Sequence, residues 1–216
     1  MKSNKKLSRK EVRIKENGFI YPFLKFAIDN IKYINLVELF KYTAKHLASE
    51  NNVVSASRIA VDVFIILKWL FIIVIWFFGY SNQFLSLFVW YLIITNLYTY
   101  FYYHIWVDEA LKTDNFTKDR IRRRFINLIM AFSYSILCFA YLFKFVYSLD
   151  IDWNNKNISF VNSIMFSFNN SLGGRYNNIN PQTDLGGLIC SIELLITFVF
   201  ATLILSRSIP QTDSKK

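Results

Sequence analysis

The stretch Val63–Tyr80, VFIILKWLFIIVIWFFGY, decides the fold class because it holds a single charged residue, Lys68, among 18 positions. At a rise of about 1.5 Å per residue, roughly 20 apolar residues cross the hydrocarbon core of a bilayer. The stretch is apolar on every side, which is typical of a membrane span rather than of a surface helix. Lys68 lies about 9 Å from the predicted inner face, and we expect its long side chain to extend inward to that interface.

Three further stretches of the chain have the same character. They cover residues 84–107, 125–149 and 186–206, and one charged residue, Lys144 or Glu193, interrupts each of the last two. Backbone N–H and C=O groups must be paired inside a bilayer, so segments this long and unalternating predict helices rather than a barrel. The sequence therefore predicts an all-α, four-span transmembrane protein.

The composition of the whole chain combines an apolar and a basic population. Of the 216 residues, 54% are hydrophobic and 19% are charged, yet the net charge is +10. A typical soluble domain carries about 25% charged residues. The composition excludes a disordered chain, a collagen-like chain and a small disulfide-stapled domain, and it argues against a soluble enzyme.

The positions of Lys and Arg predict the orientation in the membrane. Residues 1–60 carry a net charge of +7 and residues 108–124 hold six basic residues, whereas 79–83 holds none and 150–184 only two. Cytoplasmic segments are enriched in Lys and Arg, so we expect both termini to be cytoplasmic, in a bacterial inner (plasma) membrane. The charged first 16 residues lack the apolar core of a signal peptide, so the first span is expected to direct its own insertion.

The segment 22–47 has an amphipathic helical pattern, as one helix or as two with a kink, and Pro22 suits a first helical turn. Three interpretations stay open: this segment lies on membrane lipids, packs against copies of itself, or binds a cytosolic protein partner. The residues predicted to contact lipid or a partner are Lys25, Lys32, Lys41 and Lys45. Direct nucleic-acid binding is not expected, because basic arms beside a membrane usually serve topology.

The connection between the last two spans, residues 150–184, is unusually long and contains an apolar run at 158–168 that is too short to span. A run of this size beside a membrane indicates a re-entrant or interfacial helix, and turn chemistry rich in Asn and Gly follows it. Irregular backbone at membrane depth survives only where protein buries it or where it lines a watery cavity. The predicted order is span, short re-entrant helix, irregular segment, span.

This order resembles the pore module of two-transmembrane potassium channels, in which an outer helix, a pore helix, a filter and an inner helix follow one another. Without a gap, Ser167-Phe168 falls on the Ser-Phe of the family's pore helix, Tyr176 on the filter Tyr and Pro181 on the Pro beyond the filter. The resemblance covers residues 125–207. It implies a homotetramer with a pore helix at 158–170.

The filter-like residues that follow from the resemblance are Ser171, Leu172, Gly173, Gly174, Arg175, Tyr176, Asn177 and Asn178. Arg175 and Asn177 replace two glycines of the family's T-V-G-Y-G filter, whose consecutive carbonyls replace the hydration shell of a potassium ion. A shifted register keeps one glycine but needs a two-residue insertion. Under either register, potassium selectivity is not supported. Phe198 and Leu203 are the candidate hydrophobic gates of the inner pore.

Two charges interrupt the third and fourth spans at matching predicted depth. Lys144 lies five residues from the outer end of its span and Glu193 about six residues into the next. An unpaired charge inside a membrane has an unfavourable free energy, so we expect the two to form an intramembrane charge pair. The alternative is that Lys144 extends to the outer interface.

No catalytic pattern stands out elsewhere in the sequence. Cys138 and Cys190 fall in different spans and are expected to be small packing residues, and His46 and His104 have no carboxylates at metal-ligand spacing. Neither a phosphate loop nor a nucleophile elbow is present. We therefore expect no enzyme activity, no cofactor and no metal.

These observations predict an ion-channel-like membrane protein whose pore is not potassium-selective and is either gated or vestigial. The predicted domains are a basic cytoplasmic head at 1–60, two spans within 61–107, a basic cytoplasmic loop at 108–124, the pore module at 125–207 and a cytoplasmic tail at 208–216. The alternative is a membrane sensor or anchor subunit that recruits a cytosolic effector. Its size and layout resemble membrane subunits of bacterial two-component antiphage systems such as Kiwa, which implies antiviral defence.

Overall fold

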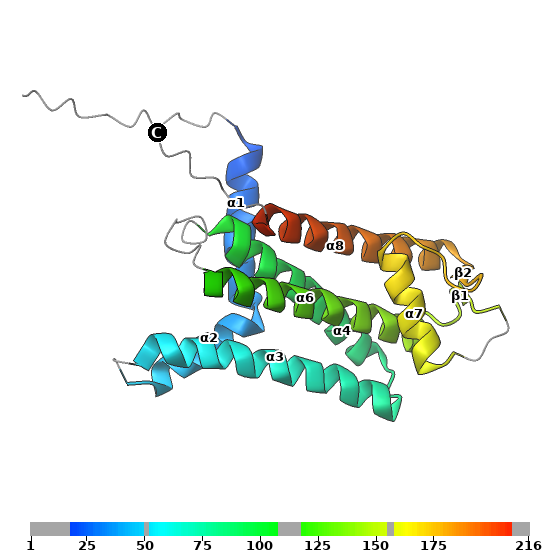
Figure 1. The fold of residues 1–216 in the computed structure, drawn as a ribbon, viewed down its shortest axis with the longest axis horizontal. Coiled ribbons are helices and arrows are strands. Elements are labelled where there is room, and N and C mark those ends of the chain that lie inside the picture. The colour runs from blue at the N-terminus through cyan, green and yellow to red at the C-terminus, as the bar shows by residue number, and fades with distance from the viewer. Residues whose placement is uncertain (1–17, 50–51, 108–117, 155–157, 209–216) are drawn as a thin grey trace, which may run out of the picture. The chain divides into compact units, whose positions relative to one another are not determined.

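A computed structural model of the chain describes residues 18–49, 52–107, 118–154 and 158–208 (Figure 1). Its helices and strands are α1 (Ile20–Ile31), the 3-10 helix η1 (Lys32–Ile34), α2 (Leu36–Leu47), α3 (Val53–Phe78), α4 (Gln83–Phe101), the π-helix η3 (Tyr102–Trp106), α6 (Lys118–Tyr141), the π-helix η5 (Leu142–Val146), β1 (Ile151–Asp152), α7 (Phe160–Ser171), β2 (Asn180–Pro181) and α8 (Asp184–Ser208). Parts of the predicted head, loop and tail, at 1–17, 108–117 and 209–216, lie outside the described residues.

The four predicted spans are confirmed as four helices long and apolar enough to cross a membrane. These helices are Val53–Phe78, Gln83–Trp106, Ile121–Val146 and Asp184–Leu203. The first of these helices begins ten residues before the apolar run at 63–80, because the preceding segment, which contains polar residues, is helical as well. One of these, Asp62, accepts two 3.1 Å bonds from Arg123 at the corresponding end of α6.

The turn between α3 and α4 is set by two local signals. Gly79 ends α3 in the left-handed region (φ 64°), a conformation that glycine adopts without steric cost. Asn82 then caps α4, its side chain accepting a 2.8 Å bond from the backbone N–H of Leu85. The two helices are thereby joined by four residues at 79–82.

The amphipathic segment forms two helices, which settles the choice between one helix and two. The chain divides into two compact units, residues 1–34 and 35–216. The first unit contains α1, which has no buried residue. The second begins at Asn35, whose side chain caps α2 by accepting from Val37 N–H at 3.1 Å. Helix α2 packs along α3, where the rings of Phe40 and Phe64 are 5.3 Å apart.

Helix α6 is the centre of the second unit and packs against α3, α4, α7 and α8 (Figure 1). In the most apolar stretch of this span, 56% of the residues are buried inside the chain, against 33% for α3 and for α8. The span that contains α6 is therefore the one most enclosed by protein. Both cysteines, Cys138 on α6 and Cys190 on α8, are free thiols buried in this core. They pack as small apolar side chains, as predicted.

The predicted short helix between the last two spans forms as α7, with its N-terminus capped by Ser159, which accepts from Asn162 N–H at 3.1 Å. Strands β1 and β2 pair antiparallel on either side of α7 in the chain. Beside them the Thr183 hydroxyl donates to the Asp150 carboxylate at 2.6 Å. A side chain at Gly186 would collide with the backbone carbonyl of Asp150, so this glycine allows the start of α8 to lie directly against residue 150.

Candidate functional site

A buried carboxylate joins α8 to α7. Glu193 is 1% exposed, and both of its oxygens have partners on α7. The Asn170 amide donates to one oxygen at 2.6 Å, and the Ser167 hydroxyl lies within hydrogen-bond distance of the other. The same Asn170 amide donates to the carbonyl of Cys190 at 3.0 Å, and Ser167 donates to the carbonyl of Ile136 at 2.9 Å. This cluster holds α6, α7 and α8 together.

The predicted charge pair between Lys144 and Glu193 is not formed in the described chain. Lys144 lies on η5 with its ammonium 5.1 Å from the ring centroid of Phe145, and no ion pair joins it to Glu193. Helix α7 contacts both η5 and α8 and provides neutral donors to the carboxylate. The two charges have matching predicted depths, but depth does not specify which side of a helix a residue faces.

The filter-like residues form a helix cap followed by a hairpin turn. Ser171 ends α7, and the N–H groups of Gly173 (φ 72°) and Gly174 bond back to the carbonyls of Asn170 and Asn169 at 2.9 and 2.8 Å. Leu172 is exposed between them. The segment therefore begins as a closing turn of α7 rather than as an extended strand.

The second half of the filter-like segment is a tight turn. The N–H of Ile179 bonds to the carbonyl of Tyr176 at 2.9 Å, and the central residues Asn177 and Asn178 both have positive φ, 50° and 58°. This is the geometry of a type I′ hairpin turn, in which Asn is a favoured residue. Tyr176 also donates to Asn162 at 3.3 Å, which ties the turn to α7. Arg175 is exposed and has no ion-pair partner in the described residues.

The two candidate gate residues have opposite environments. Phe198 is 68% exposed, whereas Leu203 is 1% exposed and belongs to the chain's own core. A residue enclosed by its own chain cannot narrow a pore between copies, so the prediction for Leu203 is wrong. Periodicity alone could not separate the two, because α8 is apolar on most of its circumference.

The four lysines predicted to contact lipid or a partner are divided between the two units. Lys25 and Lys32 belong to the first unit, whereas Lys41 and Lys45 lie on α2 in the second. Lys41 is already engaged: its ammonium donates to Glu38 at 2.8 Å and lies 3.8 Å from the ring centroid of Tyr103. Lys45 is exposed.

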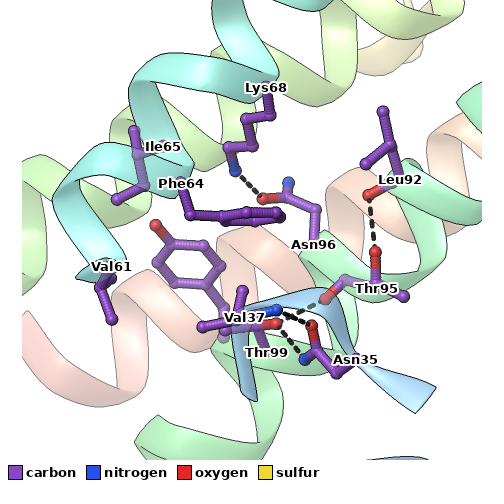
Figure 2. Close-up of a pocket in the computed structure, with 11 residues that line it drawn as sticks. Asn35, Val37, Val61, Phe64, Ile65, Lys68, Leu92, Thr95, Asn96 and Thr99 are labelled. Carbon is purple, nitrogen blue, oxygen red and sulfur yellow. Dashed lines mark hydrogen bonds between the residues drawn. The ribbon is translucent and has the colours of Figure 1, made fainter. Parts of the chain in front are cut away.

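A second buried polar cluster was missed in the sequence. Lys68 is 7% exposed, and its ammonium donates to the amide oxygen of Asn96 at 2.6 Å (Figure 2). The ammonium also lies 4.6 Å from the ring centroid of Tyr134. The Asn96 amide donates in turn to the carbonyl of Ala131 at 3.0 Å. The prediction that Lys68 extends to the interface is wrong, because it lies on the face of α3 that also buries Phe64. Asn96, an amide within an apolar span, was the available signal.

A cavity of about 40 Å³ lies beside this cluster, between the start of α2, α3 and α4 (Figure 2). On its far side Asn35 donates to the Thr99 hydroxyl at 2.7 Å, and Thr99 donates to the carbonyl of Thr95 at 2.7 Å. A cavity above roughly 10–15 Å³ admits a water molecule, and an ammonium has three N–H donors to offer. The site suits hydration of a buried cation and contains no nucleophile–base pair.

In the described part of the chain, no group of three or more His, Cys, Asp or Glu side chains is placed to hold a metal ion. Comparisons with protein-family models, curated proteins and solved structures found no match. The class of protein is therefore defined by the fold alone: an all-α chain with four apolar helices suited to an integral membrane protein.

Proposed function

We propose that the chain is the subunit of a homo-oligomeric, channel-like membrane protein in which α8 faces a central axis. The observation that carries this proposal is an exposed stripe along α8. At 100° per residue its members fall on one face of the helix. They are Asp184, Leu188, Ser191, Leu195, Phe198 and Thr202.

The direction of this α8 stripe is fixed by what lies behind it. Ile189, Glu193, Ile196 and Phe200 are buried within the same chain, and Glu193 is bonded to α7. The α8 stripe mixes polar with apolar side chains: Asp184 begins the helix, and the hydroxyls of Ser191 and Thr202 donate to the carbonyls of Gly187 and Phe198 at 2.9 and 2.8 Å. A watery axis or the stripe of another copy accommodates both kinds of side chain.

Helix α7 supports the same arrangement. Its 12 residues extend about 18 Å, roughly half the hydrocarbon thickness, so it enters the membrane without crossing it in the proposed topology. One side packs on α6 and α8, and the other exposes apolar side chains. The exposed residues are Phe160, Val161, Met165 and Phe168.

The chemistry of the segment after α7 favours a pore that does not select potassium. A helix cap and an Asn-Asn turn occupy the filter-like residues, and the permanently charged Arg175 guanidinium is exposed beside them. Such an entrance disfavours cations if copies surround one axis. The proposed pore is therefore anion-permissive, weakly selective or closed, and the resemblance to potassium-channel modules favours four copies around it.

A second candidate function rests on α1. None of its residues is buried, and two of its large apolar side chains, Phe23 and Phe26, are 62% and 70% exposed. Apolar side chains on an amphipathic helix are stabilised by a bilayer surface or by another protein. A sensor or anchor subunit that recruits a cytosolic effector would use this unit. Co-purification of a cytosolic protein that is lost on deleting residues 1–34 would favour it.

Thiol accessibility in proteoliposomes tests the leading proposal. Ser191→Cys and Phe198→Cys place thiols on the α8 stripe, and Ile73→Cys is the matched control, on an exposed apolar position of α3. Both stripe thiols should react with a membrane-impermeant, water-soluble reagent, whereas the control and the buried native thiols should not. Equal protection of the stripe and control thiols, together with a monomeric native mass, would overturn the proposal.

A further inference from the structure

A basic cavity of about 730 Å³ lies where α2, α3 and α6 meet, at the N-terminal ends of α3 and α6. Its volume is in the range of small-molecule sites, roughly 300–1,000 Å³. Five of the residues that line it are basic: Lys41, Lys45, Arg58, Arg123 and Arg124. None of the described residues that line it is acidic.

The positive charge of this basic cavity is only partly neutralised. Lys41 is paired with Glu38 at 2.8 Å, and Arg123 with Asp62 at 3.1 Å. Lys45 and Arg58 are exposed and have no ion-pair partner in the described residues. Like charges gathered without counterions repel, so an anion bound among them would be stabilised.

An independent observation comes from Ser57, which lines the same cavity. Its hydroxyl oxygen is buried and has no hydrogen-bond partner in the described part of the chain. Buried polar atoms are rarely left unpaired, and such an atom beside a cavity indicates a missing ligand or water. The Asn127 amide adds a further neutral donor to the lining.

The surroundings of the cavity indicate what kind of anion fits. Val53, Val54 and Val61 complete the lining, so apolar side chains of α3 lie among the basic and polar ones. The positive-inside pattern predicts that these ends of α3 and α6 are cytoplasmic, at headgroup level. A ligand with a phosphate group and an attached carbon skeleton matches guanidinium and ammonium donors beside valines.

We infer that this basic cavity binds a phosphate-bearing organic anion, presented either as the headgroup of an anionic phospholipid or as a soluble organophosphate. The bound phosphate would connect α2 to α3 and α6 through Lys45, Ser57 and Arg58. This inference does not rest on the proposed pore, because none of these residues lies on α7 or α8.

The test uses the full chain in nanodiscs and two probes. Thermal unfolding is followed in phosphatidylcholine discs, in discs that also contain phosphatidylglycerol, and in phosphatidylcholine discs with glycerol 3-phosphate in solution. Stabilisation only by phosphatidylglycerol identifies a lipid headgroup, and stabilisation by glycerol 3-phosphate identifies a soluble ligand. If neither probe stabilises the protein, the inference is overturned.

Variants at exposed cavity positions assign the effect to this site. Lys45→Gln and Arg58→Gln should each weaken probe binding about fivefold, the effect expected of roughly one removed charge near a membrane surface. Ser57→Ala should weaken binding without changing the net charge. Lys25→Gln with Lys32→Gln is the control, with the same charge removed from the first unit. Equal weakening by the control pair, or wild-type binding by Lys45→Gln/Arg58→Gln, would contradict the assignment.

Discussion

The amide of Asn170 on α7 donates at 2.6 Å to the carboxylate of Glu193, which is buried on α8. The bond connects a 12-residue helix, too short to cross a membrane, to a helix long enough to do so. It is backed by Ser167, one turn earlier on α7, at the other carboxylate oxygen. One side chain that interrupts the hydropathy of the fourth span therefore contributes two of the contacts that position α7 against α8.

Replacing Glu193 should loosen α7 before it unfolds the chain. Glu193→Ala removes one of two acceptors from Asn170 and from Ser167, which keep the carbonyls of Cys190 and Ile136, and we expect a loss of about 1–3 kcal/mol in the free energy of unfolding. Glu193→Gln, which retains one acceptor oxygen, should lose about 1 kcal/mol. Denaturant titration in micelles measures both, and hydrogen exchange should show faster exchange in α7. Leu194→Ala, the exposed neighbour, is the control. Unchanged exchange in Glu193→Ala would contradict the role of this carboxylate.

Exchanging the charges of Lys144 and Glu193 should not restore assembly. Direct partners tolerate a swap, but Glu193 is bonded to α7 and Lys144 lies beside Phe145. We expect Lys144→Glu/Glu193→Lys to yield no more assembled protein than Glu193→Lys alone, as measured by size-exclusion chromatography. Recovery in the double variant would show that the two charges do interact in the assembled protein.

Lys68 and Asn96 should show strong energetic coupling. Lys68→Met removes the charge at similar volume and leaves the Asn96 oxygen unpaired, whereas Asn96→Leu leaves a buried ammonium without its acceptor. We expect each single variant to be destabilised. The double variant should be more stable than the sum of the singles predicts, by about 1–3 kcal/mol. Thermal unfolding of the four proteins completes the cycle, and additive effects would exclude a direct interaction.

Two adjacent glycines on α8 should respond in opposite ways to alanine. At Gly186 a Cβ would collide with the backbone carbonyl of Asp150, whereas at Gly187 nothing lies within 4 Å. Gly186→Ala should therefore cost about 1–3 kcal/mol through overpacking. Gly187→Ala should be neutral or stabilise the helix by up to about 1 kcal/mol. Unfolding in micelles compares them, and equal effects would show that residue 150 does not lie against α8.

Some features of the candidate sites were accessible from local patterns. The short helix between the last two spans followed from an apolar run at 158–168, and α7 is found at Phe160–Ser171. The split of the amphipathic segment into α1 and α2 was one of two alternatives. The type I′ turn at Asn177 and Asn178 was not predicted, because the potassium-channel register placed a filter there. An Asn-Asn pair between two extended residues was the local signal for it.

The sequence alone determined that four helices of this chain are apolar enough for a bilayer, because a span must bury about 20 residues in hydrocarbon whatever its neighbours are. Only the tertiary structure decided which side of each helix faces protein. In that structure Lys68 lies in the core, and Glu193 is bonded to α7 rather than to Lys144. Leu203 is buried, whereas Phe198 is exposed. Hydropathy reports the depth of a residue along a span. Rotation about the helix axis is set by packing between helices, to which residues distant in the sequence contribute.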